Sequence, residues 1–131
     1  MTNNMEITED YVSFEVAKLL KEKGFDVRCN TYYISDNEIA ALPITRDFNN
    51  HGIYLSAPTH QMAMKWLREV HGLFISIGND DLGYNWQIMD VENRTDNGDP
   101  TYLTESYAGY KSYEDAVEAA LKYSLSEKIN L

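Results

Sequence analysis

Residues 59–72 constrain the fold most, because they have the pattern of one amphipathic helix with both a start and a stop signal. Thr59 is a residue type that caps helix N-termini, and Gly72 suits the left-handed position that follows a helix. The apolar side chains recur at helical spacing and predict a stripe that faces the core: Met62, Trp66, Leu67 and Val70. We therefore expect one helix here, packed by its apolar stripe against the rest of the chain.

Three strand patterns follow this helix, separated by polar turns. Residues 73–77 have an alternating pattern that places Leu73, Ile75 and Ile77 on one face, and residues 84–92 and 102–107 have the composition of strands. In the second of these strands the apolar face changes near Ile88 and Met89. Either both faces of this strand are partly covered, or a β-bulge lies at that point.

Two further helices are predicted towards the ends of the chain. Ser112 and Asp115 form a capping pattern at the start of the last helix. The first helix is expected to end at Gly24, because glycine suits the left-handed position after a helix. Its start is open between two capping residues, Thr8 and Ser13.

Residues 25–58 have the least regular pattern in the chain. Residues 31–35 and 53–56 have strand composition, but turn-forming residues lie between them, among them residues 36–38 and Pro43. A connection this long with little regular structure is unusual within a compact domain. This segment therefore either forms a flap or completes a sheet, and it is expected to carry a binding surface.

Together these patterns predict an α+β fold with the order α-(β)-(β)-α-β-β-β-α. Short connections favour an antiparallel arrangement of neighbouring strands. We therefore expect a two-layer structure, an antiparallel sheet of three or more strands with helices packed on one face. The length of 131 residues fits a single domain spanning residues 1–131, of which residues 1–7 are expected to be a loose N-terminus.

The net charge of −10 lies mostly in the C-terminal half of the chain. Residues 73–121 contain ten acidic residues and two basic ones, a net charge of −8. Such a surface attracts basic partners and repels phosphate backbones, although acidity also serves simply to keep a protein soluble. The order α-β-β-β-α occurs in double-stranded-RNA-binding domains, but Glu114 and Asp115 stand where those domains need basic residues. We therefore expect no direct contact with nucleic acid.

The sequence predicts a cytoplasmic protein. Cys29 is the only cysteine, so the chain cannot form the internal disulfides that most small secreted domains use. The polar, acidic N-terminus has neither the basic nor the apolar region of a signal peptide. No apolar run approaches the ~20 residues of a membrane-spanning helix, so we expect no membrane partner.

The sequence contains no recognisable constellation of catalytic, cofactor-binding or metal-binding residues. Its histidines are His51, His60 and His71, and the last two lie about three turns apart on one helix, too far to share a metal. No glycine-rich phosphate loop or nucleophile elbow is present. Arg28 could lower the thiol pKa of Cys29, but one cysteine without a placed histidine is a weak sign of a nucleophile. We therefore expect no cofactor and no metal, and a non-catalytic protein is favoured over an enzyme.

The residues expected to bind a partner are tyrosines and acids of the C-terminal half. Tyrosine gives a large contact area at a low cost in side-chain entropy, and it is favoured at interfaces. The same tyrosines would also fit half-buried positions on strands. The candidate set is Tyr102, Tyr107, Tyr110, Tyr113, Asp80 and Asp81.

Three segments, residues 13–25, 57–71 and 113–121, together resemble a family of small uncharacterised proteins carried by prophages and other mobile elements of gut bacteria. The likeness covers most of the chain, with the segments in the same order. It implies an accessory protein of a phage or mobile element. It brings no catalytic motif and no functional residue to this chain.

The function expected from these features is that of a non-catalytic accessory protein. It would bind a basic surface on a host or phage protein, or associate with itself as a homodimer. One version of this hypothesis is mimicry of nucleic acid by regularly spaced acids. The alternative is a small enzyme or a small-ligand-binding module, with a pocket between residues 25–58 and the sheet.

Overall fold

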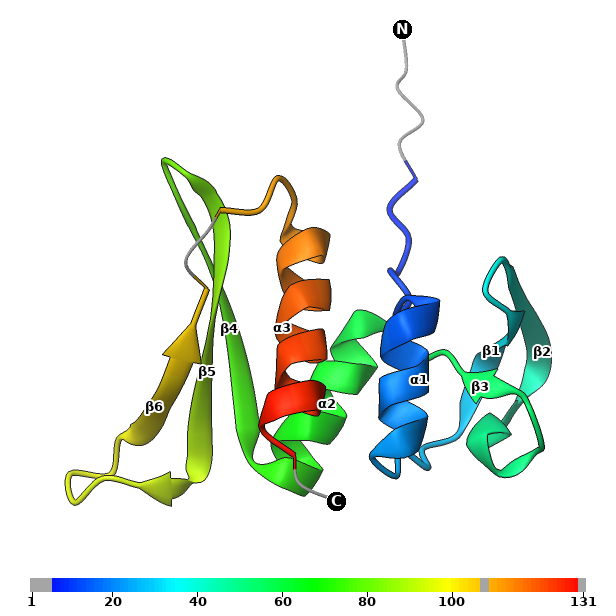
Figure 1. The fold of residues 1–131 in the computed structure, drawn as a ribbon, viewed down its shortest axis with the longest axis horizontal. Coiled ribbons are helices and arrows are strands. Elements are labelled where there is room, and N and C mark those ends of the chain that lie inside the picture. Colours follow the sequence, from blue (N-terminus) through cyan, green and yellow to red (C-terminus); the bar gives the residue numbers. More distant parts are fainter. Residues whose placement is uncertain (1–5, 107–108, 130–131) are drawn as a thin grey trace, which may run out of the picture.

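The computed structural model describes residues 6–106 and 109–129, and it places a layer of helices between two β-sheets (Figure 1). The helices are α1 (Phe14–Glu22), α2 (His60–His71) and α3 (Tyr113–Glu127). The N-terminal sheet has the order β2-β1-β3, formed by β1 (Cys29–Ser35), β2 (Glu38–Arg46) and β3 (Leu55–Ser56). The C-terminal sheet has the order β4-β5-β6, formed by β4 (Leu73–Asp80), β5 (Gly83–Arg94) and β6 (Pro100–Glu105). A short 3₁₀ turn, η1 (Phe48–Asn50), precedes β3.

The predicted α+β class, the antiparallel pairing and the order of elements are confirmed. Helices α2 and α3 pack on one face of the C-terminal sheet, as expected. The N-terminal sheet packs on α1, on the other side of the helical layer, so the fold has three layers instead of the two expected (Figure 1). None of the helices in the described residues is both long and apolar enough to cross a membrane.

The helix boundaries follow from the capping residues of the sequence. The Thr59 hydroxyl accepts a hydrogen bond from the backbone N–H of Met62 at 3.1 Å, and Gly72 ends α2 with φ of 66°. The start of α1, which the sequence left open, is at Ser13, because its side chain accepts from the N–H of Val16. The predicted caps of α2 and α3 and the stop after α1 are confirmed.

The change of apolar face on β5 reflects partial cover of both its faces. The register between β4 and β5 is unbroken, so the side chains of β5 alternate regularly between the two faces. Trp86 and Ile88 are buried on the face turned to the helices, and Met89 and Val91 are partly buried on the other face. A register shift does lie opposite Ile88 and Met89, but its extra residue, Leu103, belongs to β6. Of the two alternatives offered by the sequence, cover on both faces is therefore the one that explains the pattern of β5.

Residues 25–58 complete a sheet, and β2 is the strand that the sequence prediction missed. Residues 36–38 and Pro43 were interpreted as turns, but only Asp36 and Asn37 form the turn, as the two-residue connection of a β1–β2 hairpin. Pro43 lies within β2, which is at the edge of its sheet. Proline is tolerated at an edge, since a missing N–H there breaks no ladder hydrogen bond.

One continuous hydrophobic cluster joins all three helices and both sheets. Leu20 of α1 is fully buried in it, and Phe25 packs edge-on against Trp66 of α2 with ring centres 5.3 Å apart. The Tyr33 hydroxyl of β1 donates to the carbonyl of Val12 at 2.6 Å, which ties the N-terminal sheet to the start of α1. The helical layer is therefore the core on which both sheets pack.

Replacing Gly72 by alanine should lower the free energy of unfolding by about 1 kcal/mol, because a side chain at φ of 66° is strained. The added Cβ would also meet the side chain of Glu92, which is flexible enough to move. Urea unfolding would measure the loss. Gly72→Asn is the matched control, because asparagine meets Glu92 in the same way but tolerates the left-handed conformation better. Equal losses in the two variants would contradict an origin in backbone strain.

Candidate functional site

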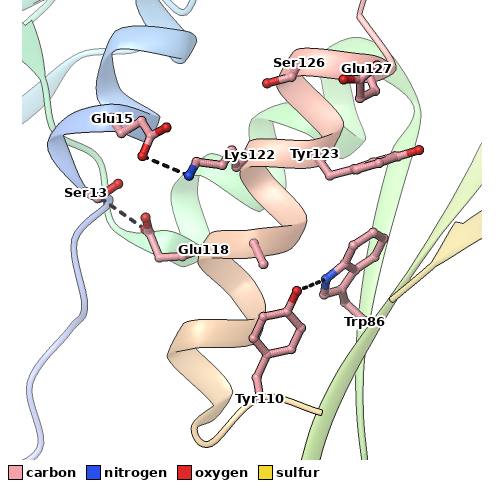
Figure 2. Close-up of a pocket in the computed structure, with 10 residues that line it drawn as sticks. Ser13, Glu15, Trp86, Tyr110, Glu118, Lys122, Tyr123, Ser126 and Glu127 are labelled. Carbon is pink, nitrogen blue, oxygen red and sulfur yellow. Dashed lines mark hydrogen bonds and ion pairs between the residues drawn. The ribbon is translucent and has the colours of Figure 1, made fainter. Parts of the chain in front are cut away.

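A surface pocket of about 490 Å³ lies between α1, α3 and β5 (Figure 2). We call it the aromatic pocket. Its lining residues are Ser13, Glu15, Trp86, Tyr110, Glu118, Ala119, Lys122, Tyr123, Ser126 and Glu127. Figure 2 shows the three aromatic rings together on one side of the pocket and the charged groups of Glu15, Glu118 and Lys122 on the other. This separation gives the pocket an apolar wall and a polar wall.

The apolar wall is built from three aromatic side chains, with Trp86 in contact with the other two. Trp86 of β5 is 5% exposed, and its ring centre lies 5.3 Å from that of Tyr123, with the planes tilted by 39°. The indole Nε1–H of Trp86 points to the hydroxyl of Tyr110 at 3.4 Å (Figure 2). Tyr110 is held in place by a backbone bridge to Tyr84 of β5. The rings are therefore fixed by the sheet on one side and by α3 on the other.

The polar wall centres on Glu118, where the ends of all three helices meet. Its Oε2 accepts a hydrogen bond from His60 Nε2 at 2.6 Å and another from the backbone N–H of Ser13 at 3.1 Å. Ser13 caps α1, and His60 is the first residue of α2. Burial alone would raise the pKa of Glu118, but the hydrogen bonds from His60 and Ser13 outweigh it and lower the pKa. The group is therefore a carboxylate at neutral pH, and it accepts the Nε2–H of the imidazole.

Lys122 is the basic residue of this pocket, and it is already paired. Its Nζ lies 2.9 Å from Glu15 Oε2, across the mouth of the pocket from α3 to α1 (Figure 2). Both side chains are largely exposed, so the pair adds little to stability. Its consequence for the site is that the ammonium group is turned towards α1 and away from the aromatic wall.

A second pocket of about 250 Å³ lies on the opposite face of β5, at the end of the β4–β5 hairpin. We call it the acidic pocket. It is lined by Asp80, Leu82, Asn85, Gln87, Glu105, Ser106 and Gly109. Gln87 follows Trp86 directly in β5, so the two side chains point to opposite faces of the sheet. The aromatic and acidic pockets are therefore separate sites.

The predicted acids lie at the hairpin end of the C-terminal sheet. Asp80 lines the acidic pocket, where its carboxylate accepts hydrogen bonds from the N–H of Leu82 at 2.9 Å and from Asn85 Nδ2 at 3.2 Å. Asp81 is exposed in the adjacent turn. Glu105 of β6, which the sequence did not single out, supplies the second carboxylate of this pocket.

The predicted tyrosines do not form one surface. Tyr102 is 53% exposed on β6, and its hydroxyl donates to Glu105 Oε1 at 2.8 Å beside the acidic pocket. Tyr110 faces the aromatic pocket instead. Tyr113 is 39% exposed at the start of α3 and packs edge-on against the ring of Tyr84 on β5. Tyr107 lies outside the described residues.

Sequence reasoning missed the residues that shape the aromatic pocket. Glu118 and Lys122 follow one another at a spacing of four on α3, as do Ala119 and Tyr123. Residues four apart share one face of a helix. This spacing was therefore the sequence signal from which these lining residues of α3 could have been found. The contribution of Trp86 had no such signal, because it depends on how the sheet packs against α3.

Residues 25–58 and the C-terminal sheet lie on opposite sides of the helical layer (Figure 1). The aromatic pocket therefore does not have the location expected for a pocket between those two parts. Within residues 6–106 and 109–129, no group of three histidine, cysteine or acidic side chains is placed to hold a metal ion. Burial, with the nearby charge of Asp47, raises the thiol pKa of Cys29 to about 11, which disfavours a reactive thiolate.

The aromatic pocket and the acidic pocket are the features of the described residues that bear on function. Comparison of the chain with protein-family models, with curated proteins and with solved structures found no match.

Proposed function

We propose that this chain is a non-catalytic interaction protein that binds a basic surface of another protein through its acidic pocket. The observation that carries the proposal is the composition of that pocket. Two carboxylates, those of Asp80 and Glu105, share it with the side-chain amides of Asn85 and Gln87. Carboxylate and amide oxygens are the acceptors that an arginine or lysine side chain needs.

The charge of the surroundings supports a basic partner. In the described part of the chain, neither Asp80 nor Glu105 forms an ion pair with a lysine or arginine. Residues 73–121 carry a net charge of −8, so their field attracts a basic protein from a distance. A second copy of this chain would bring a net charge of −10 to the same surface. Repulsion between two such surfaces favours a basic partner over self-association through this face.

The sheet face beside the acidic pocket is suited to a protein contact. On the face of the C-terminal sheet turned away from the helices, Phe74 pairs with Met89, and Met89 pairs with Tyr102 on the next strand. These three side chains lie in a row across the sheet, and Tyr102 is largely exposed. Aromatic residues and methionine are enriched at interfaces, where they supply buried area next to polar contacts. The resemblance to prophage proteins suggests that the partner is a host or phage protein.

A defined probe, a short arginine-rich peptide titrated in a calorimeter, tests this proposal at physiological ionic strength. The double variant Asp80→Asn with Glu105→Gln should bind the peptide about tenfold more weakly than the parent protein. This value follows from ~0.7 kcal/mol for each lost charge-assisted contact. NMR shift changes in the parent protein should concentrate on the hairpin end of the sheet.

The matched control is Asp96→Asn with Asp99→Asn, in the exposed loop between β5 and β6. It removes the same charge from the same sheet at a distance from the acidic pocket. We expect this control to change peptide affinity by less than about twofold at this ionic strength, because exposed charges are screened there. Equal weakening in the two double variants would show unspecific attraction to net charge and would overturn the proposal.

A further inference from the structure

We propose that the aromatic pocket binds an organic cation, an ammonium group that carries small apolar substituents. The proposal is independent of the acidic pocket, which lies on the other face of β5. It is based on one juxtaposition: three aromatic rings from β5, α3 and the segment before α3 face the same cavity as the partly buried carboxylate of Glu118 (Figure 2).

The aromatic wall supplies the first half of the recognition. A cation within about 6 Å of a ring centre is attracted by the negative face of the ring, and indole is the strongest of the common rings. Trp86 and Tyr123 lie against each other at the wall, with Tyr110 next to them. Tyr123 already attracts one ammonium group in this structure, because Lys128 Nζ lies 5.9 Å from its ring centre.

The carboxylates supply the second half. Within the described residues, hydrogen bonds to Glu118 reach only Oε2, from His60 and Ser13, so Oε1 is the oxygen that can meet a ligand. These bonds hold the carboxylate before any ligand arrives, which lowers the cost of binding. Glu127 adds a second acid at the lining, whereas the ammonium group of Lys122 is neutralised by Glu15.

The size and lining of the pocket select an organic cation over a metal ion. A volume of about 490 Å³ falls in the range of small-molecule pockets, roughly 300–1,000 Å³, and exceeds what a single ion fills. A metal ion would need several oxygen or nitrogen ligands around one point. Apolar substituents on the ammonium group, in contrast, would pack against the aromatic wall and keep the charge near Glu118. The same chemistry is offered by a free alkylated amine and by a methylated lysine side chain of another protein.

Choline is a suitable first probe, titrated while the indole N–H signal of Trp86 is followed by NMR. We expect saturable binding with Kd of about 1 mM, and a shift of the Trp86 signal but not of the Trp66 signal. The neutral isostere, in which a tert-butyl group replaces the trimethylammonium group, should bind about tenfold more weakly because it lacks the charge. A parallel titration with a blocked trimethyllysine amino acid distinguishes the two sources: tighter binding of choline assigns the site to a free alkylated amine, and tighter binding of trimethyllysine assigns it to a protein side chain.

The variant Tyr123→Leu should weaken choline binding about fivefold, because leucine keeps apolar bulk but has no aromatic face. Tyr113→Leu is the matched control, an identical change on the same helix outside the aromatic pocket. It should leave choline affinity unchanged, and it also reports whether losing a tyrosine from α3 disturbs the fold. Equal affinity for the neutral isostere, or no saturable shift of the Trp86 signal, would overturn the proposal.

Discussion

Replacing Leu20 by alanine should lower the free energy of unfolding by about 3 kcal/mol and should do so for the whole chain in one transition. Leu20 is fully buried in α1, and its cluster extends from the N-terminal sheet to the C-terminal sheet. Removing its branched end leaves a cavity in the layer on which both sheets pack. The surrounding helices close such a cavity only in part, because α1 is held at both ends by its contacts with other elements.

The expected cooperativity follows from contacts that cross the helical layer. Phe25, just after α1, packs on Trp66 of α2, and α1 also contacts α3. Destabilising α1 therefore removes support from the helices that cover the C-terminal sheet. A chain of two independent units would respond differently, with loss of stability confined to residues near α1. The single-domain prediction from the sequence is thus open to a direct test.

Urea unfolding followed by two signals provides this test. Tryptophan fluorescence reports α2 and β5 through Trp66 and Trp86, whereas far-ultraviolet circular dichroism reports all helices and strands. In Leu20→Ala both curves should move together to lower urea. Leu82→Ala is the control, because Leu82 is 74% exposed and its loss should change stability by less than about 0.5 kcal/mol. A fluorescence transition that stays in place while the dichroism transition moves would contradict a single cooperative unit.

The elements that could be predicted from the sequence are those with local signals. Ser112, Thr59 and Gly72 act within a few residues of their own positions, so each marks a helix end without knowledge of the fold. The partial cover of both faces of β5 was visible because its apolar residues change from one face to the other at Ile88 and Met89. Strand β2 was missed because Pro43 has a strong turn signal, and its tolerance depends on an edge position that only the assembled sheet defines.

The site was predicted less well than the fold, for a related reason. Tyrosine composition identified residues that can form an interface, but Tyr102 and Tyr110 lie on different faces of β5 once the strands are paired. The link between His60 and Glu118 joins residues 58 positions apart, and neither has a local pattern that marks it. Contacts of this kind arise from packing between elements, which a single sequence without its fold does not display.

Replacing Glu118 by alanine should lower the free energy of unfolding by about 2 kcal/mol, although its side chain is 28% exposed. The substitution leaves the buried Nε2–H of His60 without its acceptor and also frees the N–H of Ser13. A fully buried ion pair broken on one side costs more, about 3–5 kcal/mol, and partial exposure to water reduces that value here. In a double-mutant cycle with His60→Ala, the two losses should therefore be smaller in combination than their sum. Strict additivity would mean that the contact contributes nothing to stability.

The same carboxylate should make stability depend on pH in a defined direction. The pKa of Glu118 in the folded protein lies below its ordinary value of 4.5, so the folded state binds the proton less readily than the unfolded state does. The stabilisation is therefore fully present above about pH 4.5 and is lost as the pH falls through the lower pKa of the folded state. Glu118→Gln keeps the shape of the side chain and an oxygen acceptor but cannot titrate. Its stability relative to the parent protein should be lowest near pH 6 and should recover towards about pH 3.

A matched variant, Glu114→Gln, separates this effect from the general loss of acidic charge. Glu114 is exposed in the first turn of the same helix, so its replacement changes the net charge by the same amount without touching His60. Its stability relative to the parent protein should stay nearly constant between pH 6 and about pH 3. An equal recovery of both variants at low pH would assign the effect to net charge. A recovery confined to Glu118→Gln would show that the ionised carboxylate of Glu118, which accepts hydrogen bonds from His60 and Ser13, stabilises the folded state.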